Sequence, residues 1–239
     1  MIPLRDNIPS RTYPLVNITL IIVNVVVFLY QVMLGPELRN VVYQFAVIPA
    51  RYFHEVYVGP GRMHEVTAPE LVVPIFTSMF MHGGWLHLIG NMLYLWIFGD
   101  NVEDRLGHGR YLVFYLLCGV AASLAHIFFN PNSRIPSLGA SGAIAGVLSA
   151  YLISYPRARV LVLVPIIIFL TTFEVPAIFF LGFWFLQQFL YGVASIGIPS
   201  AETGGVAWWA HIGGFIAGAV LLAVLAQKRY RPPERDIWA

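Results

Sequence analysis

Five long stretches of this chain contain no Asp, Glu, Lys or Arg, and this feature limits the possible folds more than any other. The stretches are 14–34, 71–99, 111–133, 135–156 and 203–227. A helix needs about 20 apolar residues to cross the ~30 Å hydrocarbon core of a bilayer, so each stretch can hold one crossing. Only 11% of the residues are charged and 58% are hydrophobic, which leaves too few charges to cover a soluble domain. The sequence therefore predicts an integral protein of the lipid bilayer.

The apolar stretches are continuous rather than alternating, which favours helices over strands. We expect an all-α fold, a polytopic membrane helical bundle with six transmembrane helices. The expected spans are 14–34, 83–99, 111–129, 139–155, 174–193 and 206–227. Segment 160–173 is short and contains Pro165, which is more typical of an interfacial or re-entrant segment than of a span.

The expected organisation is a cytoplasmic N-terminus at 1–13, a membrane domain at 14–227 and a basic cytoplasmic tail at 228–239. Six spans place ten of the 14 Lys and Arg residues on the side of the two termini, whereas seven would place six there. Since basic residues concentrate in the cytoplasm, both termini are expected to be cytoplasmic.

Other features of the composition limit the partners and the compartment. A net charge of +2 gives no case for nucleic acid. The single cysteine, Cys118, lies in an apolar run and is interpreted as a buried structural thiol. No signal peptide or targeting extension is evident, which favours a prokaryotic plasma (inner) membrane. The oligomeric state is not predicted.

Polar residues inside membrane spans are costly and are therefore candidates for a functional site. In the second span, His87 and Asn91 are four residues apart and share one helix face. They are either interfacial polar residues or hydrogen-bond donors directed into a polar cavity. His126 in the third span is interpreted as structural.

Ser141 lies in the first turn of the fourth span, where unpaired backbone N–H groups and the helix dipole favour negative charge. Such a position suits a nucleophile that creates an oxyanion. The alternative is a packing surface of small residues, because Gly142 and Gly146 have the spacing of closely packed membrane helices. Gly139 is assigned to the same packing surface.

His211 lies near the start of the sixth span, and Gly214 and Gly218 repeat the packing spacing on its face. The second, fourth and sixth spans all begin on the outer side, so their polar residues can lie at similar depth. The glycines would allow the helices to approach closely enough for a hydrogen bond between Ser141 and His211. No Asp or Glu lies near that depth, so we predict a Ser–His dyad rather than a triad.

In this order, the polar residues resemble the rhomboid family of intramembrane serine proteases over about 71–226. Three motifs carry the resemblance: His82 with His87-x-x-x-Asn91, Gly139-Ala140-Ser141-Gly142, and Ala210-His211-x-Gly213-Gly214. Two further segments support it, Val102-Glu103-Asp104-Arg105-Leu106-Gly107 and Val175-Pro176-Ala177 with Trp184-Phe185 and Gln187.

The resemblance implies a serine endopeptidase that cleaves transmembrane helices without cofactor or metal. Ser141 would be the nucleophile and His211 the general base. The Ser141 backbone N–H, His87 and Asn91 would form the oxyanion hole, and His82 would line the cavity. The substrate would be a transmembrane protein whose helix enters between the second and fifth spans and contains small or helix-weakening residues.

Two departures from the family pattern concern the support of the histidine and the first outer loop. Some members carry an aromatic residue four positions after the serine, where this chain has Ala145, and some carry a Trp-Arg pair that 35–82 lacks. Two other functions are considered: an inactive rhomboid-like protein that binds membrane helices, and a transporter or metal-binding protein that uses His82, His87 and His211.

Overall fold

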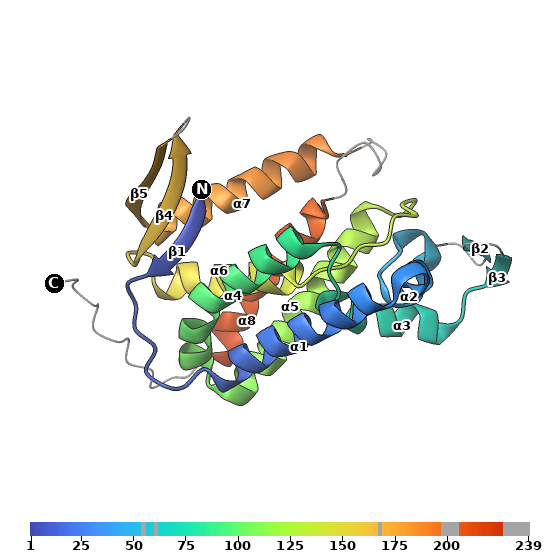
Figure 1. Ribbon diagram of the computed structural model, residues 1–239, viewed down its shortest axis with the longest axis horizontal. Helices are drawn as coiled ribbons and strands as arrows, with labels where there is room; N and C mark the ends of the chain where they lie inside the picture. The colour runs from blue at the N-terminus through green and yellow to red at the C-terminus, as the bar shows by residue number, and fades with distance from the viewer. Residues whose placement is uncertain (54–55, 60–61, 167–168, 197–205, 227–239) are drawn as a thin grey trace.

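The computed structural model describes residues 1–53, 56–59, 62–166, 169–196 and 206–226 and is mostly helical (Figure 1). The expected basic tail at 228–239 lies outside these residues. The helices are α1 (Leu15–Met33), α2 (Leu38–Phe45), α3 (Ala68–Thr77), α4 (Trp85–Leu106), α5 (His108–Phe129), α6 (Ser141–Ser154), α7 (Ala177–Ala194) and α8 (Trp208–Leu225), with short 3-10 turns η1 (Gly35–Glu37), η2 (Pro49–Tyr52) and η3 (Ser78–Phe80).

Four of the described helices, α1, α5, α7 and α8, are long and apolar enough to cross a membrane. A fifth crossing is possible if Ala68–Phe80 and Trp85–Leu106 together form one span. That span would be broken, since the two segments meet at a bend of 76°. Helix α6 has 14 residues, which gives a length of about 21 Å. Length and composition therefore support four or five crossings, and the count of six stays a prediction.

Two small antiparallel sheets accompany the helices, so the all-α expectation is wrong for these segments. One has the order β1-β4-β5 and the other pairs β2 with β3, and they lie at opposite ends of the molecule (Figure 1). The strands are β1 (Ile2–Asp6), β2 (Val56–Gly59), β3 (Arg62–Glu65), β4 (Arg159–Ile166) and β5 (Phe169–Pro176).

The described part of segment 160–173, expected to be interfacial or re-entrant, lies in the hairpin of β4 and β5. Its Val- and Ile-rich sequence suits a strand, and the N-terminal strand β1 completes the sheet from far away in the sequence. Because β5 extends to Pro176, α7 begins at Ala177 rather than at the expected residue 174. Glu174 lies on β5, where it forms an ion pair of 3.0 Å with Arg159.

A buried carboxylate joins the start of α1 to the end of α4. Glu103 is 1% exposed and accepts hydrogen bonds of 3.0 and 2.7 Å from the backbone N–H groups of Val16 and Asn17. These amides belong to the first turn of α1, where they have no acceptor within the helix. His108 also contacts Glu103. The contacts satisfy the buried charge and fix α1 against α4.

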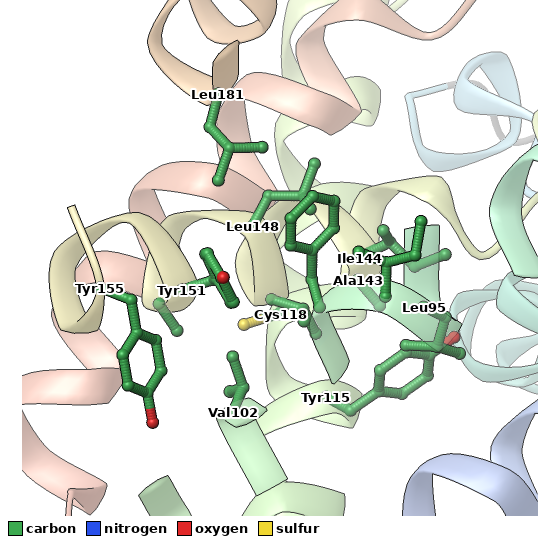
Figure 2. Close-up of a cluster of buried hydrophobic side chains, with 14 of the residues drawn as sticks. Leu95, Val102, Tyr115, Cys118, Ala143, Ile144, Leu148, Tyr151, Tyr155 and Leu181 are labelled. Carbon is green, nitrogen blue, oxygen red and sulfur yellow. The ribbon is translucent and has the colours of Figure 1, made fainter. Parts of the chain in front are cut away.

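Helix α6 lies in the centre of the hydrophobic core. Every residue from 142 to 151 is buried, and side chains of α4, α5 and α7 surround it (Figure 2). Tyr151 packs its ring edge against Phe98 of α4 at a centroid distance of 4.9 Å. Cys118 is buried in this cluster, as predicted.

Glycines allow the backbones of α6 and α8 to touch. A Cβ atom on Gly214 would lie 1.9 Å from the carbonyl oxygen of Gly142, and one on Gly218 would lie 2.4 Å from that of Gly146. Real side chains cannot occupy these positions without separating the helices. Gly214 and Gly218 therefore set the distance between α6 and α8, whereas a Cβ on Gly142 or Gly146 would first meet Ala122 or Cys118 of α5.

Substitution of Gly214 by alanine tests this close approach. We expect Gly214→Ala to lower the thermal unfolding midpoint in detergent, since overpacking typically costs about 1–3 kcal/mol. The control is Gly182→Ala on α7, where no atom lies within 4 Å of the added Cβ; this change should be neutral or stabilise by up to ~1 kcal/mol. Equal midpoints for the two variants would contradict the packing.

Candidate active site

Ser141 is the first residue of α6, and the backbone before it is held in place by hydrogen bonds. Ser137 exchanges two backbone hydrogen bonds with Val47, of 2.7 and 3.0 Å, and the Gly139 N–H donates to the Ser78 carbonyl at 2.9 Å. Gly139 has a φ of +134°, a conformation that side chains disfavour. These constraints fix the direction from which Ser141 enters the helix.

The short length of α6 bears on the depth of Ser141. A helix of about 21 Å is shorter than the ~30 Å hydrocarbon core, so α6 alone cannot reach both surfaces. Its N-terminus can therefore lie below one surface, with the preceding loop buried in protein. Such a position satisfies the rule that irregular backbone in a membrane must find its partners within the protein.

His211 lies in the first turn of α8 and faces Ser141. Its Nε2 atom is 2.8 Å from the Ser141 Oγ atom, and its side chain is 9% exposed. The contact spans 70 residues of sequence and follows from the close packing of α6 against α8. The structure thus brings together the two residues predicted to form a dyad.

His87 and Asn91 approach the same site from the first turns of α4. The Gly83 N–H donates to His87 Nδ1 at 3.3 Å, so in the neutral ring the proton lies on Nε2. That nitrogen is directed at the backbone before Ser141, since a Cβ on Gly139 would lie 2.7 Å from it. Gly139, expected to pack between helices, instead leaves space for the His87 ring.

The side-chain amide of Asn91 is a buried donor without a partner. Asn91 is 8% exposed, and its Nδ2 atom has no hydrogen-bond partner among the described residues. An unsatisfied buried donor costs about 1–3 kcal/mol. The Asn91 amide can therefore donate a hydrogen bond to an acceptor that enters the cavity.

Ser141, His211, His87 and Asn91 all line one cavity of about 520 Å³. Its walls come from α4, α6, α7, α8 and the segment 136–138. Tyr94 and Trp184 contribute aromatic surface from α4 and α7. A volume of this size is typical of substrate pockets with a few convergent polar groups.

His82 and His126 lie outside this group. His82, expected to line the cavity, is absent from the described lining and is 2% exposed. Its ring packs edge-on against His87 at a centroid distance of 5.1 Å, so it lies behind His87 instead. His126 contacts Asn130, with 3.3 Å between Nδ1 and the amide nitrogen.

The sequence-based prediction missed Gln188. This residue of α7 is 7% exposed, and its Oε1 atom lies 2.7 Å from His211 Nδ1. The prediction of a dyad rested on the absence of Asp and Glu, whereas the available signal was a pair of glutamines, Gln187 and Gln188, in an apolar helix. Both ring nitrogens of His211 therefore have a side-chain partner.

The arrangement contains the parts that acyl transfer requires. A hydroxyl contacts an imidazole, and the imidazole contacts a third polar group. The N-terminus of α6 and the side-chain amide of Asn91 lie at the same cavity as the hydroxyl. These groups surround a cavity large enough to admit part of a peptide.

The sequence of this chain is similar to those of known proteins. The Rhomboid domain matches residues 69–228, which is more than half of the chain. The chain is 32% identical over 154 residues to rhomboid protein 1, mitochondrial, of Saccharomyces cerevisiae, covering 62% of this chain and 40% of that protein. It is 45% identical over 78 residues to the rhomboid protease GluP of Bacillus subtilis, covering 33% of this chain and 15% of GluP.

A third relative is presenilin-associated rhomboid-like protein A, mitochondrial, of Danio rerio, 37% identical over 100 residues. That match covers 41% of this chain and 26% of the relative. The matched part thus spans well under two thirds of the length of each of these relatives. The domain match extends from α3 through α8 and includes every residue that lines the cavity. The chain is an integral membrane protein that belongs to the rhomboid family.

Proposed function

We propose that this protein is an intramembrane serine endopeptidase that hydrolyses peptide bonds in or near transmembrane helices of other membrane proteins. The observation that carries the proposal is the distance of 2.8 Å between Ser141 Oγ and His211 Nε2, at a cavity that also contains Asn91 and His87. Membership of the rhomboid family, which includes a relative named as a protease, supports it.

In the proposed reaction, Ser141 Oγ attacks the scissile carbonyl carbon while His211 Nε2 accepts the hydroxyl proton. The tetrahedral intermediate collapses as His211 returns this proton to the leaving amine. Water then attacks the acyl-enzyme, with His211 again as the base, and releases the second product. Apart from this water, the chemistry requires no group beyond the side chains and backbone of this chain.

The oxyanion of both intermediates would bind three donors: the Ser141 backbone N–H, Asn91 Nδ2 and His87 Nε2. The first amide of a helix has no intrahelical acceptor, and the helix dipole adds favourable potential for negative charge. The unpartnered amide of Asn91 supports its assignment as a donor. Donors held in place before the reaction contribute most to stabilising the transition state.

The substrate would reach the cavity between α4 and α7. Near the cavity, these helices contribute Leu86, which is 87% exposed, and Trp184. Further along the two helices, Tyr94 of α4 stacks on Phe180 of α7 with a centroid distance of 6.4 Å, and this contact closes the space between them. A helical substrate hides its carbonyls in internal hydrogen bonds, so it must unwind before attack. Small or helix-weakening residues near the cut are therefore expected.

The central prediction concerns Ser141 and His211. Purified protein in detergent should cleave a model single-span substrate, and Ser141→Ala or His211→Ala should lose nearly all activity. Removal of one member of such a unit typically costs about 10⁴- to 10⁶-fold in kcat. A fluorophosphonate should label the wild-type serine. EDTA should have no effect, because no step of the reaction uses a metal.

Two results would reject this function. Cleavage by Ser141→Ala at the wild-type rate would mean that another group is the nucleophile. A folded wild-type protein that binds single-span helices but neither cleaves them nor reacts with the fluorophosphonate would be an inactive member of the family.

The oxyanion assignment predicts that Asn91→Ala lowers kcat about 10²- to 10³-fold, the usual loss for one such donor. KM should change little, because the donor acts mainly on charge that develops in the transition state. Asn130→Ala is the control, since that amide contacts His126 and lies outside the described lining of the catalytic cavity. Equal kcat values for the two variants would remove Asn91 from the oxyanion hole.

We also propose six spans with both termini in the cytoplasm, on the basis of the ten-to-four distribution of basic residues. The relatives include mitochondrial, chloroplast and bacterial proteins, so they do not support a prokaryotic plasma membrane over the others. In a bacterial host, alkaline phosphatase fused to the C-terminus should be inactive and green fluorescent protein should fluoresce. The opposite pattern would contradict this topology.

A further inference from the structure

Gln188 extends the contact between Ser141 and His211 to a third helix. Its Oε1 atom is 2.7 Å from His211 Nδ1, and His211 Nε2 is 2.8 Å from Ser141 Oγ. The three side chains come from α7, α8 and α6 and form a continuous chain of hydrogen bonds. Both Gln188 and His211 are buried, so water does not readily replace the contact between them.

The chain of contacts determines which nitrogen of His211 carries the proton. A neutral imidazole has one N–H donor and one nitrogen with a free lone pair. His211 can act as the base for Ser141 only if the lone pair is on Nε2, which requires the proton to be on Nδ1. A proton on Nδ1 needs an acceptor, and the carbonyl oxygen of Gln188 lies at hydrogen-bond distance from it.

We propose that Gln188 is a positioning residue that holds His211 in the Nδ1–H tautomer and so keeps Nε2 free to accept the Ser141 proton. The inference rests on the function proposed above. It gives His211 a second partner beside Ser141, so the unit consists of a serine, a histidine and a neutral amide.

A neutral partner suits the location of this site. An ionised carboxylate beside His211 would stabilise the imidazolium more strongly, but burying it in a membrane protein costs several kcal/mol. An amide oxygen accepts the same hydrogen bond without a charge. Trp184, one turn before Gln188 on α7, packs beside His211 at a ring-centroid distance of 5.7 Å. Gln188 and Trp184 therefore restrict the orientation of the His211 ring. Ala145, four residues after the serine, has no aromatic ring that could do so.

The test replaces Gln188 with leucine, which has a similar volume and no acceptor. We expect Gln188→Leu to lower kcat for a single-span substrate about 10- to 100-fold, similar to the loss when the hydrogen-bond partner of a metal-binding histidine is removed. KM should remain within about twofold, because the amide lies outside the described lining of the cavity. Gln187→Leu, the adjacent glutamine, is the matched control and should retain the wild-type kcat.

A second measurement reports the tautomer directly and does not depend on activity. In protein labelled with ¹⁵N-histidine, the His211 signals are assigned by their loss in His211→Ala. The wild-type and Gln187→Leu spectra should show a protonated Nδ1, whereas Gln188→Leu should show protonated Nε2 as a substantial species. If the leucine variant does not fold, Gln188→Met provides a side chain of the same length for both measurements.

The proposal is overturned if Gln188→Leu retains both the wild-type kcat and the Nδ1–H signal. It is also overturned if a folded variant loses kcat while the tautomer stays unchanged, because Gln188 would then act through structure alone. Failure of the protease function has a different signature, in which Ser141→Ala cleaves substrate as the wild type does. Cleavage that needs Ser141 but is indifferent to Gln188 rejects only the positioning role.

Discussion

The close approach of α6 and α8 is the constraint on which the rest of the site depends. The carbonyl oxygens of Gly142 and Gly146 occupy the space where side chains of Gly214 and Gly218 would otherwise lie. Only this separation allows Ser141, at the start of α6, to reach His211 in the first turn of α8. The contact between catalytic candidates is therefore a consequence of backbone packing one and five residues after Ser141 on α6, and three and seven residues after His211 on α8.

The membrane explains why the polar groups gather at one end of these helices. A hydroxyl, two imidazoles and two amides would be costly if exposed to lipid, and here they face one another or the cavity. The short α6 leaves room above Ser141 for a loop, and hydrogen bonds to Val47 and Ser78 satisfy the backbone of that loop. The same short helix that limits the count of spans thus allows a polar site to lie below one surface of the bilayer.

Much of this arrangement could be predicted from the sequence because its signals are local. The expected spans agree with α1, α5, α6, α7 and α8 to within a few residues, whereas α4 continues past the expected end at residue 99 to Leu106. The order of His87, Asn91, Ser141 and His211 points to the candidate site. The β4–β5 hairpin could not be predicted in this way, since its apolar residues fit a buried helix or a strand equally well. Pairing with β1 decides between them, and that partner is more than 150 residues away.

Gln188 shows a different limit, which concerns the chemistry considered rather than the distance in sequence. No Asp or Glu lies at the right depth in the sequence, and this absence predicted a dyad without a third group. In a membrane the cost of burying a carboxylate shifts the balance toward a neutral acceptor. An uncharged amide can fix a tautomer as well as a carboxylate can, although it stabilises the imidazolium less. A glutamine or asparagine in an apolar span is therefore, like an ionisable residue there, a candidate for a functional site.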